Sequence, residues 1–301
     1  QAAKRNEDVF HIAADYVNIS GFTIRGAYDA AGIRIESDFC NVSNNICSNN
    51  DNGISLSNSN KNIITNNICS YSIAGIYIRY SNNNTISNNN CSKNKFGITI
   101  DFSNNNAITN NNCSYNDWDG IDLYKSDNSE ITNNNCSYNR FDGIDLSNSN
   151  NNSIINNNCS YNRFGIYLSN SNNNKITNNN CSYNDDEGIR LWYNSNENII
   201  TNNNICSNDD KGILLYESSN DNKIYLNNFL NNRDNVHSYS STNIWNSTEK
   251  IKYTYKGSEF EDYLGNYWSE YTGSDTDGDG IGDTPYSIDG DKDNYPLMKP
   301  F

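Results

Sequence analysis

The sequence lacks the features of a helical or membrane-spanning protein. No apolar run approaches the roughly 18–20 residues that a membrane-spanning helix needs. No apolar set recurs at helical spacing between Phe10 and Phe229, which disfavours helices over that range. Basic residues are also few, 21 Lys and Arg against 36 Asp and Glu, and the formal net charge is −15. This balance disfavours nucleic acid and anionic membrane surfaces as partners and favours divalent cations.

A short repeat occupies most of the chain. One period of it is Cys159–Tyr183, and glycine and isoleucine recur at the same interval as cysteine. Self-similarity at a fixed short period indicates a stacked array, in which one unit cannot bury its own apolar face. Cysteine recurs every 22 or 23 residues, at Cys47, Cys69, Cys91, Cys113, Cys136, Cys159 and Cys181.

Each unit predicts three short strands, because its apolar and polar residues alternate over runs that Asn, Ser and Gly separate. We therefore expect an all-β fold, a right-handed single-stranded parallel β-helix with three short strands per coil of 22–23 residues. Equivalent residues of successive coils would lie about 4.8 Å apart. Ile166 and Leu168 would join aliphatic ladders inside the tube. An amide ladder at a turn would form from Asn89, Asn111, Asn134, Asn157 and Asn179.

The regular interval stops after Asn232, where the chain becomes rich in Tyr and Trp. A last coil without a cover would present unpaired strand edges, which invite aggregation. We therefore assign residues 1–232 to the β-helix and residues 233–301 to a C-terminal cap.

The nine cysteines do not form a disulfide framework, because their number is odd and stacked side chains rarely give the torsion of a disulfide. The leading interpretation is a column of buried thiols that act as small apolar residues. Occasional bridges, or a column of copper(I) or zinc on thiolates, are the alternatives. Cys40 and Cys206 fall outside the column and are expected to be the exposed thiols.

An acidic and aromatic strip is the one candidate site on the shaft. It comprises Trp118, Asp119, Asp122, Phe141, Asp142 and Asp145. Paired carboxylates are what glycoside hydrolysis needs, and aromatic rings stack on sugar faces. No His or Arg accompanies these aspartates in equivalent positions. The strip could therefore bind carbohydrate, bind cations, carry catalysis or be plain surface.

The cap contains a motif that matches the first part of a calcium loop, Asp275 to Asp283. Asp275, Asp277 and Asp279 would give side-chain oxygens, Ile281 a backbone carbonyl, and Asp283 a carboxylate or a bridging water. The twelfth position is Tyr286 rather than Glu, so the bidentate ligand must come from elsewhere. A second acidic cluster follows and could supply it: Asp289, Asp291 and Asp293. The alternative is a solvated acidic turn.

Asn-X-Ser/Thr sequons are numerous and weakly support an exported glycoprotein. Apart from the Asn-Cys-Ser sequons of the repeat, the candidate acceptors are Asn18, Asn41, Asn83 and Asn246.

The repeat, together with Gly265–Ser269 and the Asp275–Asp283 motif, resembles the NosD-like parallel β-helix repeat proteins, and most closely surface proteins of methanogenic archaea. The resemblance covers nearly the whole chain and implies an exported right-handed β-helix. The family is described as periplasmic copper-binding, and its bacterial members assist maturation of nitrous oxide reductase. We expect calcium rather than copper here, because the chain has one methionine and two histidines, and its thiols are predicted to face a dry core.

The leading functional hypothesis is a non-enzymatic, calcium-stabilised protein of the cell surface or extracellular space. It would act as a structural or adhesive rod, with self-association or glycans as candidate contacts. A second hypothesis is a polysaccharide-active hydrolase or lyase that uses Asp119, Asp122, Asp142 and Asp145. A third is copper delivery through thiols.

Overall fold

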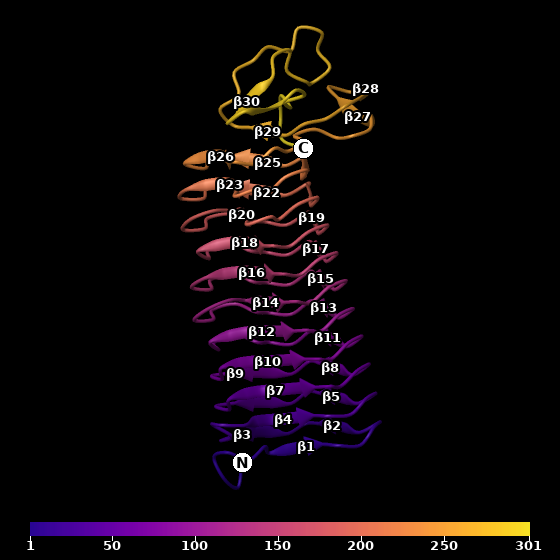
Figure 1. The fold of residues 1–301 in the computed structure, drawn as a ribbon, viewed down its shortest axis with the longest axis vertical. Helices are drawn as coiled ribbons and strands as arrows, with labels where there is room; N and C mark the ends of the chain where they lie inside the picture. Colours follow the sequence, from indigo (N-terminus) through magenta and orange to yellow (C-terminus); the bar gives the residue numbers. More distant parts are fainter.

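The computed structural model describes residues 1–301 as a column of stacked coils without a helix (Figure 1). Eleven strands form one parallel sheet along the column, and each strand comes from a different coil. In order along the sheet they are β1 (Phe10–Ile12), β4 (Ala31–Ile35), β7 (Asn52–Ser57), β10 (Ala74–Arg79), β12 (Phe96–Asp101), β14 (Ile121–Tyr124), β16 (Asp142–Ser147), β18 (Phe164–Ser169), β20 (Ile189–Trp192), β23 (Lys211–Tyr216) and β26 (Asp234–Tyr239).

A second parallel sheet has ten shorter strands. They are β2 (Asn18–Ser20), β5 (Asn41–Ser43), β8 (Ile63–Thr65), β11 (Thr85–Ser87), β13 (Ala107–Thr109), β15 (Glu130–Thr132), β17 (Ser153–Ile155), β19 (Lys175–Thr177), β21 (Ile199–Thr201) and β24 (Lys223–Tyr225).

The third side of the column is a sheet only near its ends. Its strands are β3 (Thr23–Arg25), β6 (Ile46–Ser48) and β9 (Ile68–Ser70), then β22 (Asn204–Cys206), β25 (Asn228–Leu230) and β29 (Tyr267–Trp268). Between them the contact is reduced to single parallel bridges at Asn90, Asn112, Asn135, Asn158 and Asn180. Three strand positions per coil, all parallel, confirm the predicted β-helix.

The core is the continuous apolar interior of this column. Ile166 and Leu168 pair in register with Ile144 and Leu146 of the preceding coil, and all four are fully buried. The seven repeat cysteines are fully buried as well and belong to the same core cluster. Glycine opens each coil of the large sheet because no side chain fits there. A Cβ on Gly143 would lie 2.5 Å from the carbonyl oxygen of Gly165.

Three buried asparagine ladders and one buried serine ladder satisfy the backbone at the turns, where the sequence predicted one asparagine ladder. In the predicted ladder, Asn134 Nδ2 donates to Asn157 Oδ1 (3.0 Å) and to the carbonyl of Ile108 (2.8 Å). A second ladder runs through Asn62 and Asn84, and a third through Asn94 and Asn116. Most rungs therefore hydrogen-bond both to a neighbouring rung and to the backbone, which offsets the cost of burying an amide. Asn139 Nδ2 and Asn243 Nδ2 are the exceptions, because they are buried without a partner.

Cys40 is buried, so its predicted exposure is wrong. Its backbone N–H donates to Asn62 Oδ1 at 2.7 Å. Cys40 therefore occupies the first rung of the second ladder, a position that asparagine takes in the following coils. Cys206 is half-buried, as expected for a residue displaced from the column by Ile205.

The parallel pairing continues beyond residue 232, because β26 pairs with β23 and β29 pairs with β25. The last rung of the first ladder is Asn266, which accepts from Asn227 Nδ2 at 3.0 Å. Two antiparallel hairpins lie in the same C-terminal segment, β27 (Ile251–Tyr255) with β28 (Ser258–Asp262) and β30 (Tyr286–Ile288) with β31 (Asp291–Asp293). Figure 1 shows this segment (yellow) over the end of the column.

Aromatic rings join the C-terminal segment to the last coil. Trp268 stacks on Phe229 with ring centroids 4.4 Å apart and on Tyr286 at 4.3 Å. Trp245 and Trp268 are almost fully buried and belong to the core cluster of the shaft. The apolar core therefore extends from the shaft into this segment without a break.

Candidate functional site

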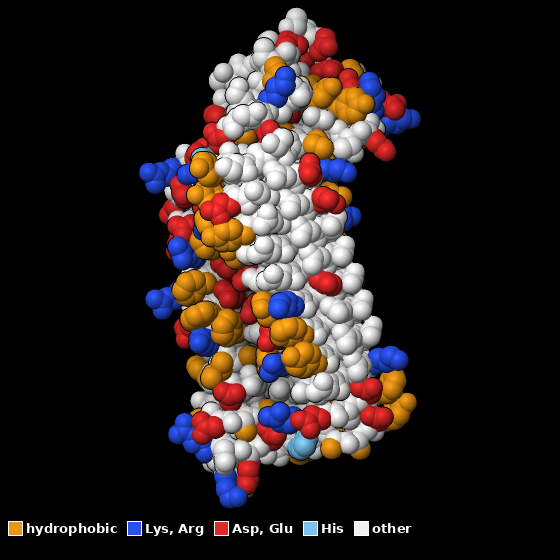
Figure 2. Space-filling model, in the orientation of Figure 1, with side chains coloured by type: hydrophobic (Ala, Val, Ile, Leu, Met, Phe, Trp, Pro, Cys, Tyr) orange, Lys and Arg blue, Asp and Glu red, His pale blue; other side chains and the backbone are white.

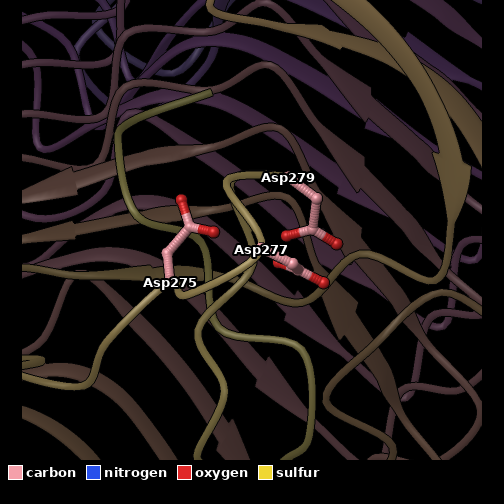
Figure 3. Close-up of side chains that lie close together, drawn as sticks. All are labelled: Asp275, Asp277 and Asp279. Carbon is pink, nitrogen blue, oxygen red and sulfur yellow. The ribbon is translucent and has the colours of Figure 1, made fainter.

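The acidic loop between β29 and β30 gathers three carboxylates. One carboxylate oxygen of each of Asp275, Asp277 and Asp279 lies within 4.8 Å of the others (Figure 3). Gly278 and Gly280 adopt positive φ angles of 79° and 95°, which glycine tolerates, and these angles give the loop its sharp turns. The N–H of Gly278 donates to Asp275 Oδ1 at 2.8 Å. The loop thus places carboxylate oxygens of alternate residues close together, as the first part of a calcium loop does.

No cation of the protein neutralises these three carboxylates, since none of the ion pairs involves them. Burial, followed by the charges of Asp277 and Asp275, raises the pKa of Asp279. The nearby Tyr253 hydroxyl is buried without a hydrogen-bond partner. Burial and the charge of Asp279 raise the pKa of Tyr253 to about 12. The loop is therefore a region of uncompensated negative charge.

The group of three converging carboxylates does not include the other residues predicted for this site. Asp283 accepts from Ser274 Oγ and from the N–H and hydroxyl of Thr276. The side chain of Ile281 is buried against Leu226 and Leu264.

Asp289, Asp291 and Asp293 face the last coils of the shaft. Asp289 accepts from the N–H of Ser238, and Asp291 accepts from the N–H of Asn243. Asp293 is fully buried and accepts from the N–H of Asn266 (2.7 Å) and from Trp268 Nε1 (2.9 Å). Burial raises the pKa of Asp293 to about 6, against these hydrogen bonds. This second cluster ties the C-terminal segment to the shaft and does not join the acidic loop.

The outward face of the large sheet carries the other candidate site, which we call the outer strip. It consists of three columns of side chains on β14, β16, β18, β20, β23 and β26. The first column is the residue before each repeat glycine, and the others follow on the strand. The columns are Asp119–Asp142–Phe164–Glu187–Lys211–Asp234, Asp122–Asp145–Tyr167–Arg190–Leu214–His237, and Tyr124–Ser147–Ser169–Trp192–Tyr216–Tyr239. Figure 2 shows hydrophobic and charged side chains in a band along one side of the shaft, beside a broad face that carries few of either.

The four predicted aspartates of the outer strip lie together. Asp122 and Asp145 are direct register partners, and Asp119 Oδ1 accepts from the N–H of Asp142 at 2.9 Å. Burial raises the pKa of Asp119 to about 6. Burial, followed by the neighbouring aspartates, holds the pKa values of Asp122, Asp142 and Asp145 well above their usual range. Burial and neighbouring like charges thus disfavour the ionised form of these carboxylates.

The predicted aromatic row is present, but cations cover its ring faces. Trp118 lies between Phe96 and Phe141, with ring centroids 5.4 and 5.2 Å apart. Lys95 Nζ lies 4.5 Å from the centroid of the Trp118 ring. Trp118 remains 43% exposed, so its role as a carbohydrate contact stays a prediction.

The sequence pattern did not point to Glu187 and Arg190, which are two residues of the outer strip. Arg190 and His237 stand in the same column as Asp122 and Asp145, so the expectation that no His or Arg shares their position is wrong. The slots of Glu187 and Arg190 vary from coil to coil, with Lys211 and Leu214 at the next positions. Only the register with the predicted aspartates could have pointed to these two residues.

The histidines and the methionine are dispersed in this chain, and the stacked thiols are sealed in the core. Each repeat thiol is fully buried, and burial raises the pKa of Cys136, Cys159 and Cys181. His11 and His237 lie on β1 and β26, at opposite ends of the large sheet, and Met298 is the single methionine. These residues do not fit a copper site, because thiolate and neutral imidazole ligands must come together and lose protons.

The four candidate glycosylation acceptors differ in access. Asn18 and Asn83 are exposed, and Asn83 sits in a turn with a φ of 58°. Asn41 is half-buried, and so is Asn246, whose Nδ2 donates to the carbonyl of Ser247.

Solved structures with a similar fold include carbohydrate-related β-helices. The "Dettilon tailspike protein (gp208)" shares 15% identity, with a TM-score of 0.60 over 75% of this chain and 55% of its own. A point mutant of the "periplasmic alginate epimerase AlgG" shares 18%, with a TM-score of 0.54 over 75% and 62%. "XylC with xylose" shares 14%, with a TM-score of 0.51 over 66% and 44%. This chain thus spans less than two thirds of each, and the likeness establishes the fold alone.

The family comparison covers most of the sequence. No curated protein is similar enough to this sequence to count as a match. No helical segment here has the length and apolarity that a membrane crossing requires. The family model described as "Periplasmic copper-binding protein (NosD)" matches residues 2–122 and 118–273. Together with the parallel β-helix, this match shows that the chain belongs to the NosD family.

Proposed function

We propose that this NosD-family β-helix is a non-enzymatic rod of the cell surface or extracellular space, stabilised by calcium at its C-terminal end. It acts as a structural or adhesive element, and its long flat faces offer surfaces for self-association. The periplasmic description of the family supports an exported location.

The observation that carries the calcium part is the convergence of Asp275, Asp277 and Asp279 without a protein cation. Like charges at this distance repel unless a cation lies between them. An all-oxygen set suits calcium, a hard cation, and suits copper poorly. These three side chains would hold the ion, and water would complete its coordination.

Calcium in this loop would strengthen the cover over the last coil. The loop continues into Ile281, which packs with Leu226 of the shaft and with Leu264 and Leu297 of the C-terminal segment. Fixing the loop therefore fixes the small cluster that closes this end, so its effect should appear as thermal stability. In this proposal the C-terminal segment is the cap that protects the terminal strand edges.

The test is thermal unfolding by circular dichroism with EDTA, with calcium chloride and with magnesium chloride. We expect calcium to raise the Tm of the wild type, and magnesium to raise it much less. Asp277→Asn should abolish the calcium effect and leave the Tm in EDTA unchanged, since Asp277 is exposed. Asp209→Asn, an exposed carboxylate outside the loop, is the matched control. An equal Tm in calcium and EDTA would refute the calcium part.

A second candidate function is polysaccharide cleavage, and the paired carboxylates Asp122 and Asp145 favour it. Burial, followed by the charges of neighbouring aspartates, raises the pKa values of both. A general acid near neutral pH needs such a pKa. Reducing-end assays on polysaccharides, with Asp122→Asn and Asp145→Asn as controls, distinguish the two functions. Cleavage that both variants lose would replace the non-enzymatic proposal.

A further inference from the structure

The outer strip has more unsatisfied polar groups than any other part of the surface. Nine buried side-chain nitrogen and oxygen atoms lack a hydrogen-bond partner in the whole chain. Four of them lie in the columns of this strip or directly in line with it: Thr99 Oγ1, Asp142 Oδ1, Glu187 Oε2 and Arg190 Nε. Buried polar atoms are nearly always paired in native proteins, so such a concentration indicates an absent partner.

Three of these atoms come from coils two apart. Asp142 and Glu187 are 7% and 5% exposed, so each carboxylate has already lost its water without gaining a partner for that oxygen. The Nη1 atom of Arg190 is 3.6 Å from Glu187 Oε2, an ion-pair distance that leaves both groups free to hydrogen-bond. With a strand spacing of about 4.8 Å, two coils span about 10 Å, the length of roughly two sugar units.

A shallow groove of about 560 Å³ begins at Glu187 and Arg190 and continues along the strip on the side away from Asp142. Glu187, Arg190 and Trp192 form its first part, followed by Lys211, Tyr216 and His237. Trp192 and Tyr216 stack at 4.4 Å and present their ring edges as one apolar wall. The volume is within the range of small-ligand sites.

We infer that the outer strip holds a neutral, hydroxyl-rich glycan along the shaft axis, with Glu187 and Arg190 at the centre of its binding site. A sugar hydroxyl both donates and accepts. It therefore satisfies a carboxylate oxygen such as Glu187 Oε2 and an N–H such as Arg190 Nε at once. The rows of the strip repeat at the coil spacing, and a chain of sugars offers hydroxyls at a similar interval.

The charge of the strip selects against acidic glycans. Asp119, Asp122, Asp142, Asp145 and Glu187 lie on three of four successive coils. The basic residues beside them are Arg163, Arg190 and Lys211, and Lys211 is already paired with Asp210. A polyuronate would place its carboxylates against these aspartates in a protein of net charge −15. The bound chain is therefore neutral. This inference goes beyond the proposed rod function and does not depend on calcium.

The experiment is isothermal titration of the intact protein with four hexasaccharides. Three are neutral, β-1,4-linked glucose, xylose and N-acetylglucosamine, and one is β-1,4-linked mannuronate. We expect at least one neutral hexasaccharide to bind and the mannuronate not to bind. Glu187→Gln and Arg190→Gln should each weaken binding at least tenfold with little change in Tm. Asp209→Asn, outside the strip, should bind as the wild type does.

Each outcome tests the glycan-binding site independently of the proposed rod function. Absence of binding by all three neutral sugars, tighter binding of the mannuronate, or full binding by Glu187→Gln would overturn the inference. If a variant lowers the Tm, hydrogen exchange of β18 and β20 upon addition of the bound hexasaccharide gives the second readout. Protection at these strands in the wild type supports the site, and its absence overturns it. Cleavage of a bound hexasaccharide would support the site and overturn only the non-enzymatic part of the proposed function.

Discussion

The buried amide ladder should contribute far more stability than the exposed one beside it, and consecutive residues allow the comparison. The side chain of Asn134 is buried and takes part in four hydrogen bonds. It donates to Asn157 and to Ile108, and it accepts from the N–H and Nδ2 of Asn111. The side chain of Asn135 is exposed and takes part in three, with Asn112, Asn158 and Ser137. The two side chains thus differ chiefly in access to water.

Asn134→Ala leaves the buried Asn111 N–H without its partner and removes three further hydrogen bonds of buried groups. An unpaired buried group costs roughly 1–3 kcal/mol and each lost bond about 1 kcal/mol, so we expect a loss of about 4 kcal/mol around this coil. In Asn135→Ala, water replaces every lost partner, and the expected loss is below about 1 kcal/mol.

Hydrogen exchange followed by mass spectrometry measures this difference locally, which suits a solenoid that need not unfold in one step. A loss of about 4 kcal/mol corresponds to roughly 1,000-fold faster exchange of β13, β15 and β17. Equal exchange in Asn134→Ala and Asn135→Ala would refute the argument, because bond number rather than burial would then govern stability.

Three further predictions concern protons, thiols and glycine. Burial raises the pKa values of Asp119 and Asp293 to about 6, so the folded state holds protons that the unfolded state releases, and the fold gains stability as pH falls from 7.5 to 5. The free energy of unfolding rises by about 1.4 kcal/mol for each group. The Tm in EDTA measures this rise, which should be smaller in Asp119→Asn. A Tm that falls as the pH is lowered over this range would contradict the prediction. In the native protein a thiol reagent should react with Cys206 and leave the other eight cysteines unmodified until guanidinium chloride is added. The same pattern is expected in the presence and in the absence of copper. Rapid modification of several native thiols would show that the cysteine column is accessible. Gly143→Ala should destabilise the fold by several kcal/mol, because the added Cβ would lie 2.5 Å from the Gly165 carbonyl oxygen. Gly257→Ala, on an open hairpin turn with a φ of 86°, should cost only about 1 kcal/mol. Similar losses of stability in the two variants would contradict the steric argument.

The β-helix was predictable because its determinants repeat. The equivalents of Ile166 and Leu168 and the repeat cysteines recur at one interval. Stacking the repeats in register therefore places equivalent residues in columns. The two additional ladders were visible as recurring asparagines, but the sequence does not show which asparagines face inward. Cys40 shows the same limit, because only the register with Asn62 reveals that it takes a ladder position.

The sites were less predictable because they depend on departures from the repeat. The three carboxylates of Asp275, Asp277 and Asp279 are close in sequence, and the structure brings them together. Asp289, Asp291 and Asp293 follow the same pattern, yet their partners are backbone N–H groups of the last coils, which no local motif specifies. Glu187 and Arg190 gain meaning only when coils far apart in sequence are placed side by side.

The direction of the ladder bonds gives the shaft an unusual response to tension. Rungs such as Asn134 to Asn157, and the strand pairs beside them, lie along the long axis, so a pull on the two ends loads the bonds between coils head-on. Each coil contacts only its neighbours and would detach as a unit. Every detachment would release about 75–78 Å of extended chain, from 22 or 23 residues at about 3.4 Å each. A rod of this construction would absorb a sudden strain in a series of small yields and would rewind from the coils that remain.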